Sequence, residues 1–208
     1  EMKGNRAAAQ ETYKLLLEAD DVEKVDRCAF ENGTYIKTDG KKSNANLVMY
    51  SSEMLDIIRL NIEPEIQENV SAGCIPILVS SSMAEELPVG TRTEISLAFD
   101  DTIKISCEVA GILQRDSAVP VVFSYGDTME LGNMAILPEA LSEYKFVVFA
   151  KDMDELFDQL TNVNFLIEPK NNISGEKLAV SLQDRMKNYG TVNTYKTIAT
   201  GALKNRLE

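Results

Sequence analysis

The chain has 208 residues, of which 44% are hydrophobic and 26% are charged, and its formal net charge at pH 7 is -12. This composition is typical of a folded protein, and the acidic balance argues against a nucleic-acid ligand because no basic stripe is present to displace counterions from phosphates. Histidine is absent, which removes the commonest general base and the commonest metal ligand at neutral pH.

The three cysteines, Cys28, Cys74 and Cys107, are widely spaced and form no C-x-x-C pair. Neither a zinc knuckle nor a redox motif is therefore indicated. The cysteines could form one disulfide and leave one free thiol, or all three could be buried as apolar side chains. We prefer the second alternative, because cysteine is among the residues most often buried.

The sequence contains no charged-then-apolar leader and no apolar run of the about 20 residues needed to cross a bilayer. It begins at Glu1 without an initiator methionine. We therefore expect either a soluble protein or an excised piece of a larger one, and the missing start favours the piece.

The first elements are predicted from local patterns. Asn5–Leu17 is rich in alanine and leucine and predicts a helix. Asn32-Gly33 is a strong hairpin signal, and it predicts a turn between strands at about 26–30 and 34–38. A further strand at Leu47–Tyr50 is expected, followed by a short amphipathic helix at about 52–60.

The stretch Cys74–Leu113 is expected to be the structural centre of the chain. Its apolar run Ile75–Val79 predicts a strand buried on both faces. Ser82 and Glu85 have the spacing of a capping box, which predicts a short helix, and Gly90 marks the turn that ends it.

Two alternating segments follow, Glu94–Phe99 and Lys104–Leu113, and they predict an antiparallel hairpin around Asp100-Asp101. Further strands are expected at Val119–Phe123 and Met134–Leu137.

The buried-strand signature recurs at Phe146–Ala150, where Asp152 and Glu155 repeat the capping pattern before a short helix. Asn164–Glu168 predicts another strand. Ser174 is expected to cap the longest clear helix of the chain, which ends at about residue 190.

The densest carboxylate group comprises Asp152, Asp154, Glu155 and Asp158. A calcium or magnesium site would use such ligands, but acidic residues in a first helical turn already favour the helix dipole, and we prefer this structural interpretation. The serines at 80–82 lack a histidine base and a G-x-S-x-G elbow, so they are expected to cap the helix. We predict no catalytic, cofactor-binding or metal-ligating residue, and no cofactor.

Cys74–Leu113 resembles one particular family. The matching positions are distributed over a strand, a short helix, a glycine turn and an extended hairpin. They are Val79, Ser80, Met83, Ala84, Leu87, Gly90, Val109, Gly111 and Ile112. Three later segments are also similar: ILPEAL at 136–141, VVFAKDMDELFDQL at 147–160 and GTVNTY at 190–195. The pattern resembles the extracytoplasmic domain of FtsX-like ABC transporter permeases, the MacB-like periplasmic core. It departs at Ser81, where members often carry Glu or Asp.

The resemblance implies an α+β fold. It implies a porter-like α/β sandwich lobe, which we assign to residues 1–100 and 132–208, and a smaller inserted strand-rich lobe at about 101–131. Such a domain sits between two transmembrane helices, so the first helix would run up from one of them and both chain ends would lie close together on the membrane side.

The resemblance also implies a non-catalytic role at the extracytoplasmic face of a bacterial cell membrane. The implied partners are a cytoplasmic ATPase, reached through the flanking helices, a second permease copy, and a peptide, lipid or lipoprotein ligand. Export, lipoprotein release, sensing of an antibiotic peptide and control of a cell-wall hydrolase all remain open. A free-standing secreted or surface binding protein is the alternative, and an enzyme ranks third.

Overall fold

The computed structural model describes residues 2–51, 70–98, 100–113, 120–125, 128–133, 145–160 and 163–188. The elements in chain order are α1 (Met2–Leu17), β1 (Val22–Ile36), β2 (Lys42–Tyr50), β3 (Ile75–Ser80), the 3-10 turn η1 (Ser81–Met83), β4 (Arg92–Leu97), β5 (Asp100–Leu113), β6 (Pro120–Tyr125), β7 (Thr128–Asn133), β8 (Phe146–Phe149), α4 (Asp154–Phe157), β9 (Val163–Pro169) and α5 (Gly175–Met186). Within these residues, no helix has the length and apolar character needed to span a membrane.

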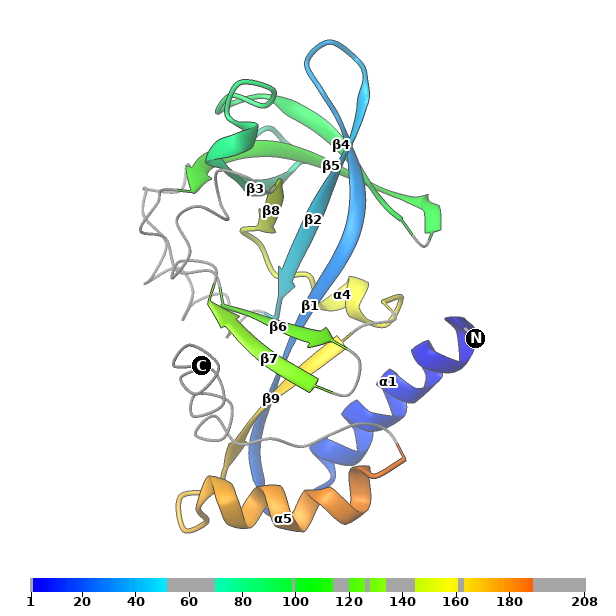
Figure 1. Ribbon diagram of the computed structural model, residues 1–208, viewed down its shortest axis with the longest axis vertical. Helices are drawn as coiled ribbons and strands as arrows, with labels where there is room; N and C mark the ends of the chain where they lie inside the picture. The colour runs from blue at the N-terminus through cyan, green and yellow to red at the C-terminus, as the bar shows by residue number, and fades with distance from the viewer. Residues whose placement is uncertain are drawn as a thin grey trace.

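Seven strands form one sheet in the order β2-β8-β3-β5-β4-β1-β9, and β1 also pairs with β2. Six strands therefore close on themselves as a barrel, from which β1 and β9 extend as a two-stranded ribbon (Figure 1). The β2–β8 and β3–β5 pairs are parallel and the other pairs in this sheet are antiparallel. The mixed sheet with few helices confirms the α+β class, whereas the closed barrel does not clearly match the expected sandwich. A separate hairpin consists of β6 and β7.

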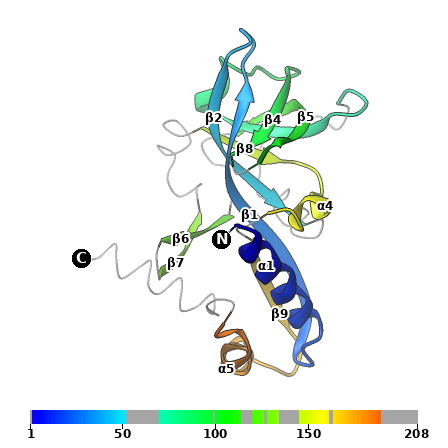
Figure 2. The same ribbon diagram turned by 90° about the vertical axis from the view of Figure 1, so that its right-hand side faces the viewer.

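The long strand β1 connects two hydrophobic cores. Its first half, from Val22 to Ala29, pairs with β9, and its second half, from Cys28 to Ile36, pairs with β2. At about 3.3 Å per residue, its 15 residues reach roughly 50 Å. One core fills the barrel, and the other lies where α1 and α5 pack on the ribbon, at the lower end of the molecule in Figures 1 and 2.

The expected hairpin at Asn32-Gly33 is wrong, because β1 runs through both residues without a break. Gly33 pairs with Ala45 of β2 and with Leu97 of β4 at the closure of the barrel. A Cβ atom on Gly33 would lie 2.4 Å from Leu47 Cδ1 and 2.8 Å from the carbonyl oxygen of Ser96. The glycine therefore permits a close approach of strands and does not form a turn.

The strand Ile75–Ser80 is as predicted, and Gly90 has a φ of 83°, in the left-handed region that a glycine turn uses. The hairpin of β4 and β5 also forms, but the predicted turn residues, Asp100 and Asp101, belong to β5, where Asp100 pairs with Leu97. The Ser82–Glu85 capping box is wrong. Only the three-residue η1 forms there, without a side-chain cap. The Ser80 hydroxyl instead accepts a hydrogen bond of 3.0 Å from the backbone N–H of Phe146, which ties β3 to β8.

The capping pattern of Asp152 and Glu155 is not found, because α4 begins at Asp154 after Met153 and no side-chain cap bond is made at Met153. The Asp152 carboxylate instead accepts from the Asp154 N–H at 2.9 Å. The cap of α5 is confirmed, since the Ser174 hydroxyl accepts from the N–H of Lys177 at 3.3 Å. Outside the described residues lie the helix expected at 52–60, the strand at 134–137, the segment 190–195 and the two chain ends, Glu1 and Glu208.

Residues 101–113, which belong to the expected insertion, lie in β5 between β3 and β4. The division of the chain into two lobes stays a prediction.

Candidate functional site

Arg27 marks the point where β1 leaves the barrel and continues into the ribbon. Its backbone is fixed to the residue after β2: the Arg27 N–H donates to the Ser51 hydroxyl at 3.1 Å, and the Ser51 N–H donates to the Arg27 carbonyl at 2.9 Å. The side chain leaves this anchored backbone toward α1 and α4. Only 10% of it is exposed, although arginine is rarely buried unless it is paired.

The Arg27 guanidinium is held between two aromatic rings and two carboxylates. Its Cζ atom lies 4.3 Å from the ring centroid of Tyr13 and 4.8 Å from that of Phe157. Its terminal nitrogens contact Asp154 Oδ1 at 3.1 Å and Asp158 Oδ1 at 3.4 Å. We call Tyr13, Arg27, Asp154, Phe157 and Asp158 the Arg27 junction, because it joins α1, β1 and α4.

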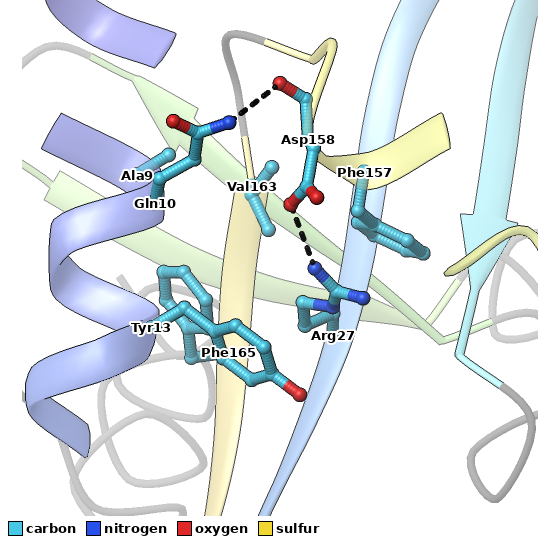
Figure 3. A pocket seen from close by; sticks show the side chains of 8 residues that line it. All are labelled: Ala9, Gln10, Tyr13, Arg27, Phe157, Asp158, Val163 and Phe165. Carbon is cyan, nitrogen blue, oxygen red and sulfur yellow. Dashed lines mark hydrogen bonds and ion pairs between the residues drawn. The ribbon is translucent and has the colours of Figure 1, made fainter. Parts of the chain in front are cut away.

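A shallow hollow lies beside the junction between α1, β1, α4 and β9 (Figure 3). Tyr13 and Phe165 stack on its aromatic side with ring centroids 6.0 Å apart, and the Gln10 amide donates to the Asp158 carbonyl at 3.2 Å. A cation already neutralised by two carboxylates is neither a base nor a nucleophile. The arrangement is suited to holding elements together.

Part of the acidic cluster has a role that the sequence did not reveal. Asp154 and Asp158 face Arg27, at the i and i+4 positions that share a helix face, while Asp152 binds backbone. Among the described residues, no group of three or more His, Cys, Asp or Glu side chains is placed to hold a metal ion. Arg27 itself was not singled out from sequence, because a lone arginine in a strand carries no local signal of its partners.

A second polar cluster lies at one side of the barrel and joins the end of β1, the start of β2, the turn after η1 and the start of β8. We call it the Lys145 cluster, and it consists of Tyr35, Lys37, Ser43, Glu86 and Lys145. The Lys145 ammonium contacts Glu86 Oε2 at 2.7 Å, the Tyr35 hydroxyl at 3.0 Å and the Ser43 hydroxyl at 3.2 Å. Tyr35 also donates to Glu86, and Lys37 Nζ lies 2.9 Å from Glu86 Oε1.

The distance between Ser43 and Lys145 is that of a serine-lysine pair, but the electrostatics oppose catalysis. Burial alone would lower the pKa of Lys145, yet its hydrogen bonds with Glu86 and Tyr35 raise that pKa above its usual value. A lysine held protonated cannot remove a proton from serine at neutral pH. The cluster therefore closes one side of the barrel as a network of ion pairs.

The same network makes barrel stability depend on pH. Burial tends to raise the pKa of Glu86, but hydrogen bonds from Lys145, Tyr35 and Lys37 outweigh it and lower the pKa to about 2. A depressed carboxyl pKa contributes stability above the unfolded value, near 4.5, and this contribution is lost as the pH falls toward 2. Because 27% of the side chain is exposed, we expect a contribution of only about 1–2 kcal/mol.

We therefore expect the free energy of unfolding of Glu86→Gln to be lower than that of the natural protein at pH 6, and the difference to shrink between pH 4.5 and 2. Urea unfolding followed by circular dichroism at several pH values measures this difference. Ser43→Ala removes a contact of Lys145 without removing a titrating group, so its deficit should stay constant with pH. A deficit of Glu86→Gln that is independent of pH would contradict the assignment.

Comparison with known proteins gives structural matches only. No family model matches the chain, and no curated protein matches it. The extracellular domain of the noncanonic ABC-type transporter YknZ from Gram-positive bacteria matches with a TM-score of 0.45 and 15% identity, over 86% of this chain and 83% of that one. A domain of a putative permease from Porphyromonas gingivalis matches with a TM-score of 0.39 and 16% identity, over 85% and 75% of the two chains.

The periplasmic region of MacB from Actinobacillus actinomycetemcomitans matches with a TM-score of 0.42 and 9% identity, over 96% of this chain and 82% of that one.

Proposed function

We propose that this chain is the extracytoplasmic, non-catalytic domain of an ABC transporter permease, and that it transmits movement of transmembrane helices to work done outside the membrane. The observation that carries the proposal is the Arg27 junction, which ties α1 to the barrel through Tyr13 on the helix and Asp154 and Asp158 on α4. In the proposed arrangement α1 continues from a transmembrane helix, so a displacement of that helix reaches the barrel through this joint.

The residues that carry the family resemblance support the proposal by forming one continuous unit. Val79, Met83, Leu87 and Val109 are all fully buried in the barrel core, and Gly90 makes the turn between them. Motif residues that are buried together in this way form a packed core, and a domain that transmits force requires such a core. The division into a porter-like lobe at 1–100 and 132–208 and an insertion at about 101–131 is part of the same proposal, and residues 101–113 of that insertion form β5 of the barrel.

The partners follow from the proposed class. A cytoplasmic ATPase would supply the movement, a second permease copy would complete the membrane part, and a peptide, lipid or lipoprotein would be the ligand outside. The work would be export, lipoprotein release, sensing of an antibiotic peptide or control of a cell-wall hydrolase. The net charge of -12 is compatible with a cationic ligand, although solubility accounts for it equally well.

Fractionation of cells that express the full-length gene product tests the proposal. We expect the protein in the cell membrane, with this domain exposed to reagents added outside the cell, and an ATPase that co-purifies with it in mild detergent. A protein released without membrane anchorage would instead favour the free-standing secreted binding protein. Turnover of an ester, peptide or phosphate substrate that is lost on replacing one named serine or aspartate would favour an enzyme.

A further inference from the structure

Helix α1 meets the rest of the molecule through polar contacts along one of its faces. Arg6, Gln10 and Tyr13 are spaced by four and three residues, which places them on the same face of the helix. We call these three residues the docking row. Arg6 contacts Asp100 at the start of β5, with 3.8 Å between the charged atoms, Gln10 donates to Asp158, and Tyr13 covers Arg27.

The other end of α1 is held differently. Leu16 and Ala19 are buried with Leu178, Leu182 and Met186 of α5 in the second core. Burial of apolar side chains is the dominant stabilising term in folding, whereas an ion pair between partly exposed groups and a single hydrogen bond at the surface contribute little. The helix is therefore anchored most firmly at its C-terminal end, and its first turns are held through Arg6 and Gln10 at the surface. Between them, Tyr13 stacks on Phe165 and covers Arg27.

The docked position of α1 also leaves one polar group unsatisfied. Arg27 Nε is buried and has no hydrogen-bond partner in the described part of the chain. The Tyr13 ring lies over this guanidinium and the hollow of Figure 3 borders it, so a movement of α1 away from β1 would expose the N–H to water. An unsatisfied buried donor destabilises the docked state relative to an open one.

We infer that α1 is a releasable helix: its first turns undock from the barrel as a unit while Leu16 and Ala19 remain in the second core. The hinge then lies near Leu16, and the docking row is the surface that separates. Undocking would interrupt the connection through the Arg27 junction, so its use as a release step in transmission rests on the proposed function. The undocking itself is a property of the domain and is measurable without any transport assay.

Hydrogen exchange read by mass spectrometry tests the inference on the whole protein. Once undocked, this short helix is marginal in water and unfolds locally, so we expect the amides of residues 7–13 to exchange at least about tenfold faster than paired amides of β1. Raising the salt concentration from about 50 to 500 mM is expected to accelerate this exchange further, because the Arg6–Asp100 pair is screened. Exchange of α1 only at the rate of global unfolding would overturn the inference.

A matched pair of variants separates undocking from fraying of the helix end. Gln10→Ala removes the contact to Asp158 and is expected to raise the exchange rate of residues 7–13 about three- to tenfold. Lys14→Ala, at an exposed position of the same helix, should leave the rate unchanged, and both substitutions introduce the best helix former. Equal acceleration by the two variants would show that the docking row plays no part. Membrane fractionation of the natural protein remains a separate test of the proposed function.

Discussion

Replacing Gly33 by alanine is expected to lower the free energy of unfolding by about 3 kcal/mol, or to prevent the barrel from closing. The added Cβ would lie 2.4 Å from Leu47 Cδ1 and 2.8 Å from the Ser96 carbonyl oxygen. The Leu47 side chain is fully buried and its Cγ also lies 2.9 Å from the added atom, so it has little room to move. The carbonyl is backbone of β4 and can move only if the strand moves. Because β1 pairs with β2 and β4 at this position, that shift would loosen the closure of the barrel.

Gly175 offers a matched control for the same substitution. It is the first residue of α5, and nothing lies within 4 Å of the Cβ that alanine would add. Gly175→Ala is therefore expected to leave stability unchanged or raise it by up to about 1 kcal/mol, since alanine has less freedom in the unfolded chain and favours a helix. Urea unfolding of both variants measures the difference, and a similar small effect for both would mean that the barrel accommodates the extra methyl group.

The elements that could be predicted from sequence have signals contained within a few residues. The apolar runs of β3 and β8 indicated buried strands, and Ser174 indicated the start of α5, and each is found at that place. The β4–β5 hairpin was predicted for the same reason, because its two alternating segments lie next to each other in the chain, although the expected turn residues Asp100 and Asp101 belong to β5.

The closure of the barrel and the Arg27 junction could not be predicted from local sequence. The dipeptide Asn32-Gly33 looks the same in sequence whether it forms a turn or allows two strands to approach closely. The residues that distinguish these alternatives, Leu47 and Ser96, lie outside any short window around it. The partners of Arg27 are 127 and 131 residues away, so no window of sequence contains the site. Ser80 likewise bonds to Phe146 and not to a helix end.

Replacing Arg27 by alanine is expected to lower the free energy of unfolding by about 2–4 kcal/mol. The substitution removes a cation from between the rings of Tyr13 and Phe157 and leaves a void where the buried side chain packs. It also breaks the contacts to Asp154 and Asp158, but these carboxylates are 44% and 64% exposed and stay hydrated once the arginine is gone. Most of the loss should therefore come from packing. Urea unfolding gives the size of the loss.

Arg27→Met separates packing from charge at the same position. Methionine keeps contact with both rings, introduces no buried charge and has a flexible side chain that adapts to the space, so we expect a loss of no more than about 1 kcal/mol relative to the natural protein. Asp158→Asn, which alters one of the exposed ion pairs alone, should change stability by less than about 0.5 kcal/mol. If methionine were as damaging as alanine, the ion pairs and not the aromatic packing would hold α4 to β1, and the loss caused by Arg27→Ala should then shrink as the salt concentration rises.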